Sequence, residues 1–198
     1  MSLQIALTSK SFQTSNYPSV GKDSQQITET RKKSLETLGR HNELVKHPQD
    51  NTRSLEERLY DARALCKIKT SEVAMHLDNE WRVRFFSQLD NLMDIENWED
   101  DDTPVTVTSF TTLLRMITSI KPARRPGLGS TSGGHIIAAW TMEADRLTIE
   151  CLPNDRVRWV LSRIVDGVRE SAAGDVTLTR LPAVLSPYNP DRWFTHGA

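Results

Sequence analysis

The chain has 198 residues, of which 37% are hydrophobic and 26% are charged, and its formal net charge at pH 7 is −1. This length allows one domain with a tail, and the near-neutral charge excludes a global attraction to a nucleic-acid backbone. No apolar run approaches the ~18 residues needed to span a bilayer. The N-terminal "MSLQIALTSK" has no basic segment before its apolar residues, so we expect no signal peptide and a cytoplasmic protein.

The first 50 residues differ from the rest of the chain. They are rich in Ser, Thr, Gln, Asn and Lys, and their apolar residues are sparse and follow no period. Such a segment cannot bury enough surface to offset the entropy cost of ordering it. We therefore expect residues 1–50 to be a flexible polar tail and residues 51–198 to form a single α+β domain.

Two helices are predicted after this tail. Ser54 and Glu57 have the spacing of a capping box, which predicts a helix that begins near residue 54. Its apolar stripe is formed by Leu55, Leu59, Ala62, Leu65 and Ile68. A second helix is expected to begin near residues 70–71, with a longer stripe at the same spacing. That stripe consists of Val73, Leu77, Trp81, Phe85, Leu89 and Leu92.

An acidic loop and a third helix come next. The sequence "DIENWEDDDTPV" concentrates carboxylates around Trp98, and Thr103 with Pro104 suits the start of a helix that reaches Ile120. The helices thus span residues 54–120. The segment "KPARRPGLGSTSGG" then ends the helical period, because it combines prolines with glycines.

Beyond residue 134 the apolar period changes from 3.6 to 2. "HIIAAWTM", "RLTIECL" and "VRWVL" are separated by turn residues and predict an antiparallel meander. "DVTLTRL" could add a fourth strand after a loop "SAAGD", which gives a sheet over residues 135–181. We therefore predict an α+β fold, in which about three N-terminal helices pack on one face of a three- to four-stranded antiparallel β-meander. The prolines of "PYNPDRWF" exclude regular structure there, and we expect Trp193 and Phe194 to dock on the domain.

The glycine-rich stretch "GSTSGGH" does not carry a phosphate-binding motif. Gly129 and Gly134 have the spacing of a P-loop, but His135 stands where the lysine should be. Ser130 or Ser132 with His135 could form a nucleophile site, with Asp145 as a guessed partner, but no nucleophile elbow is present. We favour a turn at a strand start in which Gly133 and Gly134 supply positive φ angles.

Two groups of charged residues are candidates for binding. The acidic run could be a cation site, a nuclease site or a contact for a basic partner, and it lacks the spacing of a calcium loop. Basic residues near the sheet could instead contact phosphates: Lys121, Arg124, Arg125, Arg156, Arg158 and Arg163. The residues that we expect to bind a partner are Trp98, Glu99, Asp100, Asp101, Asp102, Arg124 and Arg125. No cofactor or metal is expected, and Cys66 and Cys151 are interpreted as buried, reduced thiols.

Residues ~85 to 162 resemble a recurring pattern in small bacterial proteins of unknown function. The pattern has an "NWDGYGA"-like loop and a "PTxxGGIxLEW"-like strand, and the matching pieces here are "LDNLMDIENWEDD", "KPARRPGLGSTSGGHIIAAW" and "RLTIECLPNDRVRW". The resemblance rests on Trp98, Gly133, Gly134 and Trp140. This chain departs from it by lacking Gly and Tyr after Trp98 and by carrying Ala139 before Trp140. Such proteins often occur beside toxin–antitoxin or phage-defence genes, which implies an accessory or neutralising role.

Three functions follow as hypotheses. The first is a non-enzymatic module that binds a protein, such as a neighbouring-gene product, in a toxin-neutralising or defence system. The second is a nuclease or hydrolase that uses Asp100–Asp102 or Ser132 with His135. The third is a nucleic-acid-binding regulator of its own operon, which would depend on Arg124 and Arg125.

Overall fold

Residues 53–195 are described by the computed structural model, so the predicted tail of residues 1–50 lies outside the described residues. The longer helices are α2 (Leu55–Glu72), α3 (Asn79–Leu92) and α4 (Val107–Ile120). The strands are β1 (Gly127–Ser130), β2 (Ile136–Met142), β3 (Asp145–Leu152), β4 (Arg156–Val165) and β5 (Val168–Thr177). Short helices complete the fold: η1 (Ala74–His76), η2 (Ile95–Asn97), η3 (Leu178–Arg180), α5 (Leu181–Leu185), η4 (Ser186–Tyr188) and α6 (Asp191–Phe194).

The α+β class and the antiparallel meander are confirmed, but the number and the bounds of the strands were wrong, and the structure has short helices beyond the three that were predicted. The sheet has five strands in the order β1-β2-β3-β4-β5, and every neighbouring pair is antiparallel. It spans residues 127–177 and not 135–181. β1 lies within the segment that we interpreted as a linker. Its sequence, GLGS, has too few side chains to show a period of 2, and its pairing with β2 forms the strand.

The segment "SAAGD", predicted as a loop, is part of β5. Its small residues do not display an apolar pattern, but Gly174 lies opposite Trp159 in the register of β4 and β5. A Cβ atom at Gly174 would come within 2.8 Å of the Trp159 indole nitrogen. A residue without a side chain is therefore required at this position, because the indole lies against the backbone of β5.

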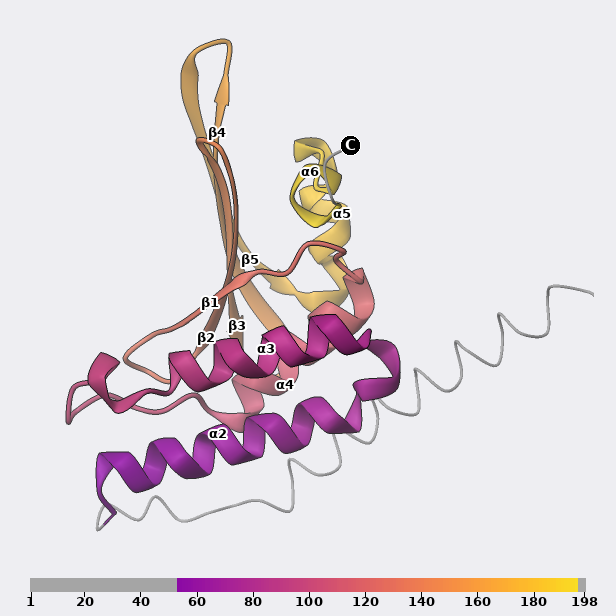
Figure 1. The fold of residues 1–198 in the computed structure, drawn as a ribbon. Coiled ribbons are helices and arrows are strands. Elements are labelled where there is room, and N and C mark those ends of the chain that lie inside the picture. Colours follow the sequence, from indigo (N-terminus) through magenta and orange to yellow (C-terminus); the bar gives the residue numbers. More distant parts are fainter. Residues whose placement is uncertain (1–52, 196–198) are drawn as a thin grey trace, which may run out of the picture.

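One face of the sheet forms the core. Its side chains alternate along the three central strands, as predicted: Ile136, Ala138, Trp140, Leu147, Ile149, Cys151, Val157, Trp159 and Leu161 are buried. α4 packs against β2 and β3, and α3 lies beside β1. α2 packs against α3 and α4, so the expectation that all three helices cover the sheet was wrong for α2 (Figure 1). The predicted stripe of α3 is confirmed by buried Trp81, Phe85 and Leu89.

The boundary between the first two helices was also misplaced. The capping box at Ser54 and Glu57 is confirmed, but α2 continues to Glu72 and leaves Ile68 exposed. α3 begins only at Asn79, where the Asp78 carboxylate accepts a hydrogen bond from the Trp81 amide at 2.7 Å. Val73 is buried on the connection between α2 and α3, so the apolar period continues across the end of α2. Periodicity alone therefore could not locate the boundary between the two helices.

The start of α4 and the C-terminal segment bring two further corrections. α4 is capped by Thr106 and not by Thr103, and its first residue is Val107. The segment "PYNPDRWF" contains η4 and α6, so the prediction that it excludes regular structure was wrong. Its docking is confirmed, because Trp193 and Phe194 are buried, and Phe194 meets Trp140 edge to face at 5.1 Å.

Candidate functional site

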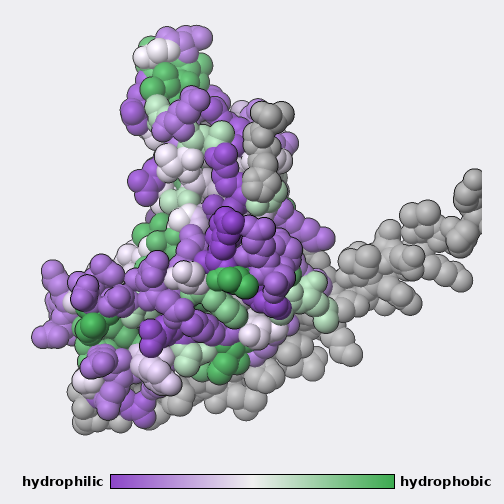
Figure 2. Space-filling model, viewed as in Figure 1, coloured by the Kyte–Doolittle hydropathy of each residue, from purple (hydrophilic) through white to green (hydrophobic). Residues whose placement is uncertain are grey.

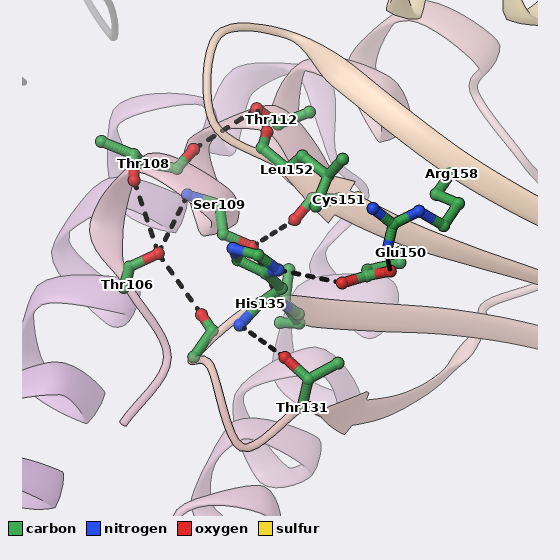
Figure 3. A network of polar contacts seen from close by, with 12 residues as sticks. Thr106, Thr108, Ser109, Thr112, Thr131, His135, Glu150, Cys151, Leu152 and Arg158 are labelled. Atoms are coloured by element: carbon green, nitrogen blue, oxygen red, sulfur yellow. Dashed lines mark hydrogen bonds and ion pairs between the residues drawn. The ribbon is translucent and has the colours of Figure 1, made fainter. Parts of the chain in front are cut away.

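A network of polar contacts fastens the N-terminal half of α4 to the ends of β2 and β3 (Figure 3). The Ser109 hydroxyl donates to the Cys151 carbonyl at 2.6 Å and accepts from the Ile136 amide at 2.8 Å. The Thr112 hydroxyl donates to the Leu152 carbonyl at 2.7 Å. These bonds explain why a helix with many hydroxyl residues is stable here: the side chains satisfy strand-end backbone groups that would otherwise be buried without partners.

His135 lies beside this network, on the face of the sheet opposite to the one that α4 covers. Its Nδ1 atom is 2.9 Å from Oε1 of Glu150, and Oε2 of the same carboxylate accepts from Arg158 at 2.8 Å (Figure 3). Glu150 was missed at the sequence level. The register of β2 and β3 could have indicated Glu150, because Ile137 pairs with Glu150 and His135 is two residues before Ile137, on the same face of the sheet.

The predicted nucleophile arrangement is not brought together. No hydrogen bond joins Ser132 to His135 in the described part of the chain, and the Ser132 carbonyl accepts from the Thr103 amide at 3.1 Å. The guessed partner Asp145 lies at the opposite end of β2 and β3, where it pairs with Met142. Its buried carboxylate accepts from the Ile164 amide at 2.7 Å and from Arg192 at 2.6 Å. The suggestion of Asp145 as the partner of His135 was therefore wrong.

The glycines next to His135 have different roles. Gly134 has a φ angle of +75°, but Gly133 is not in the positive region, so the expectation was right for one of the two. A Cβ at Gly134 would come within 2.6 Å of the Pro104 carbonyl oxygen. The Gly134 carbonyl accepts from the Thr106 amide at 2.9 Å. Gly134 therefore allows the loop before α4 to lie directly on the loop before β2.

The predicted acidic residues form one closed turn, which we call the acidic turn (residues 99–102). The Glu99 amide donates to the Asp102 carboxylate, and the Asp102 amide donates to the Glu99 carbonyl, both at 3.0 Å. The guanidinium of Arg58 on α2 donates to the carbonyls of Asp100 at 3.2 Å and Asp102 at 3.4 Å. The backbone of the turn is thus held while Glu99, Asp100 and Asp101 are exposed to solvent. Within residues 53–195, no three His, Cys, Asp or Glu side chains lie together as a metal site.

Trp98 precedes the acidic turn and is half-buried. Its indole N–H donates to the Leu92 carbonyl at 2.7 Å, which ties the loop to the end of α3. The ring lines a shallow groove of about 400 Å³, together with residues of α3 and of β1, among them Gln88 and Leu128. Trp98 is therefore held in place by its own fold, with part of its surface open to a groove.

Arg124 and Arg125 lie apart from the acidic residues. The Arg124 amide donates to the Phe194 carbonyl at 3.0 Å, its carbonyl accepts from the Trp140 indole at 2.9 Å, and its guanidinium contacts the Met142 sulfur. These contacts lie at the Met142 end of β2, whereas the acidic turn is joined to the loop at its other end. A seven-residue strand separates them by about 20 Å.

Three of the six residues of the predicted phosphate-binding patch have carboxylate partners. Arg156 pairs with Asp175 at 2.8 Å, Arg158 with Glu150 at 2.8 Å, and Arg163 with Glu170 at 2.9 Å. A carboxylate beside each of these guanidinium groups reduces the positive potential that a phosphate would meet.

A surface that the sequence analysis did not consider projects from the body. β3 pairs with β4 only as far as Arg146 and Ser162, whereas β4 and β5 stay paired to the turn at Asp166 and Gly167. We call residues 163–170 the hairpin tip (Figure 1). Ile164 and Val168 are 43% and 66% exposed there, and Figure 2 shows apolar side chains gathered near this end of the molecule.

The hairpin had a recognisable signal in the sequence. "IVDGVR" contains Asp-Gly between apolar residues, and both turn residues have positive φ angles, of 51° and 78°. This is the two-residue turn that matches the twist of paired strands.

Both cysteines are buried free thiols, as predicted. Burial raises the pKa of Cys66, and burial together with the nearby Glu150 carboxylate raises the pKa of Cys151. Neither thiol is positioned as a nucleophile, because a reactive cysteine needs a lowered pKa and access to solvent.

Comparisons with protein-family models, with curated proteins and with solved structures found no match to this chain. Among the described residues, no helix is long and apolar enough to cross a membrane.

Proposed function

We propose that this chain is a non-enzymatic module that binds another protein through the hairpin tip. The observation that carries the proposal is the exposure of Ile164 and Val168 on a hairpin that extends beyond the rest of the sheet (Figures 1 and 2). Ile164 and Val168 point to opposite faces of the hairpin, because Ile164 pairs with Arg169 and Val168 pairs with Val165. A partner that buries both side chains would therefore enclose the tip, and exposed apolar side chains on a projecting element are typical of interaction surfaces.

The tip is held in shape before any partner binds. The Asp145 carboxylate accepts from the Ile164 amide at the point where β3 no longer reaches β4. Arg163 forms an ion pair with Glu170, and its guanidinium lies over the Tyr188 ring at 5.4 Å. A preorganised hairpin loses little conformational entropy on binding, so most of the gain from apolar burial remains available as affinity. Full burial of each aliphatic side chain contributes about 1.5–3 kcal/mol.

The other two hypotheses have less support. Nucleic-acid binding would depend on Arg124 and Arg125, but the Arg124 guanidinium contacts the Met142 sulfur. The arginines of the sheet that could extend this surface, Arg156, Arg158 and Arg163, have carboxylate partners. Hydrolysis through Ser132 and His135 would need a hydrogen bond between them, and the described residues contain none. The acidic turn could supply a second contact to a basic partner, because its exposed carboxylates are held on a fixed backbone.

The biological setting of the proposal comes from the resemblance at Trp98, Gly133, Gly134 and Trp140. It implies an accessory role in toxin neutralisation or phage defence, with the product of a neighbouring gene as the partner. The two buried free thiols fit the reducing compartment that we propose for such a role.

Affinity purification from native lysate with three variants tests the proposal. A tip variant with Ile164→Ser and Val168→Ser should lose a partner that the wild type retains. Val83→Ser changes a valine on α3 whose exposure, 58%, lies between those of Ile164 and Val168, and this variant should retain the partner. An acidic-turn variant, Asp100→Asn with Asp101→Asn, locates the surface: loss of the partner in this variant alone would show that the tip is not the binding site.

A further inference from the structure

The two edges of the sheet are different. β1 is a four-residue strand beside α3. The residue that precedes it, Pro126, is held to α3, because the side-chain amide of Gln88 donates to its carbonyl at 2.8 Å. β5 is a ten-residue strand whose extensive contacts are with β4 alone among the described elements. Within residues 53–195, the sheet therefore has one covered edge and one long open edge, and an open edge is a template for another strand.

The hairpin turn fixes which backbone groups of β5 point outward. Val165 and Val168 flank the two-residue turn and therefore form a hydrogen-bonded pair. Hydrogen-bonded and non-hydrogen-bonded pairs alternate along antiparallel strands, so the even-numbered residues of β5, beginning with Val168, direct their backbone N–H and C=O groups to β4. The intervening residues direct their N–H and C=O groups to the open side. Within residues 53–195, no hydrogen bond occupies these outward groups of Arg169, Ser171, Ala173 and Asp175.

We propose that β5 pairs antiparallel with β5 of a second copy of this chain, with Ala172 on the two-fold axis. This register places Arg169 of each copy directly opposite Asp175 of the other. The outward N–H and C=O groups of one copy then meet those of the other, because Arg169 faces Asp175 and Ser171 faces Ala173 across the axis. The dimer would join the two sheets into one continuous sheet.

The charged side chains on the sheet face that carries Arg158 support this register. On the core side, Val168 lies opposite Val176, and Glu170, whose carboxylate already pairs with Arg163, lies opposite Gly174, over which the Trp159 indole packs. On the opposite face, Arg156 contacts only Oδ1 of Asp175, so Oδ2 is open to Arg169 of the second copy. Moving the axis to Ala173 would place Arg169 opposite Thr177 and would lose both ion pairs. Opposite charges across paired strands stabilise a register, and like charges destabilise it.

The size of the contact sets the conditions of the test. An interface made by one strand edge falls in the small class of protein interfaces, so the dimer should be weak and visible only at high concentration. Sedimentation velocity of the full chain at low salt, over a concentration series, should therefore show a reversible monomer–dimer equilibrium.

Charge reversal gives a specific test of the register. Arg169→Asp places two aspartates opposite each other twice, and Asp175→Arg does the same with arginines, so each variant alone should weaken the dimer about tenfold or more. An equal mixture of the two variants should restore association, because both contacts of the mixed dimer are complementary. Far-UV circular dichroism shows whether each variant is folded.

A backbone variant provides an independent control. Ala173→Pro removes an outward N–H without touching the bonds between β4 and β5, so it should abolish the dimer and keep the fold. A wild type that stays monomeric at all concentrations, or a mixture of charge variants that stays as weak as each alone, would overturn the proposal. The dimer does not rest on the proposed function: a monomeric Asp175→Arg variant, whose substitution lies outside the hairpin tip, should still retain a partner bound at the tip.

Discussion

Replacing Gly134 with alanine should destabilise the domain by about 3 kcal/mol. A residue with a side chain at a φ angle of +75° costs about 1 kcal/mol. The added Cβ would also lie 2.6 Å from the Pro104 carbonyl oxygen, which is backbone and cannot rotate away. To relieve this overlap, the loop before α4 and the loop before β2 would have to move apart. That movement strains the hydrogen bonds from Thr106 to Gly134 and from Thr103 to Ser132, which contribute about 1 kcal/mol each.

Gly133→Ala is the matched control for this prediction. Its Cβ would meet no atom closer than 3.8 Å, and its backbone is outside the positive-φ region. In urea unfolding, Gly134→Ala should lose about 3 kcal/mol, or about 10 °C in thermal midpoint, and Gly133→Ala should stay within about 0.5 kcal/mol of the wild type. Equal effects of the two substitutions would refute the assignment of different roles to the two glycines.

Further variants test the core and the sheet. Asp145→Ala removes a buried acceptor from the β4 backbone and from a guanidinium, so the free energy of unfolding should fall by about 2–3 kcal/mol in urea; a change below about 0.5 kcal/mol would contradict that role. Gly174→Val should displace the Trp159 indole, detected as a shift in tryptophan emission and a lower thermal midpoint, and an unchanged spectrum would oppose the packing described. Cys66 and Cys151 should react with Ellman's reagent only on unfolding, because burial raises the pKa of both thiols; rapid labelling of the native protein would contradict their burial.

The core of the fold could be predicted because its residues follow strong periods. The alternation around Trp140 and Trp159 located the central strands, and the stripe through Trp81 and Phe85 located α3. The edges could not be found this way. β1 is made of small residues that show no period, and β5 combines exposed residues with Gly174, whose role depends on a tryptophan on the neighbouring strand.

The sequence predicted contacts within the candidate sites only between residues that are close in the chain. Residues close in sequence, such as Glu99 and Asp102, are close in the fold because one turn contains them. The partner of His135 depended on the register of β2 and β3, which no local pattern states, so Asp145 was named in place of Glu150. The hairpin tip was overlooked, although its Asp-Gly turn is a direct sequence signal.

Photo-crosslinking in native cells tests the central claim most directly. A photoreactive amino acid at Val168, which is 66% exposed on the hairpin tip, should give a discrete crosslinked product with one protein other than a second copy of this chain. The same group at Val83, which is 58% exposed on α3, should give none. A crosslink at position 83 equal to that at position 168, or no product at position 168, would contradict the assignment of the tip as a protein-binding surface.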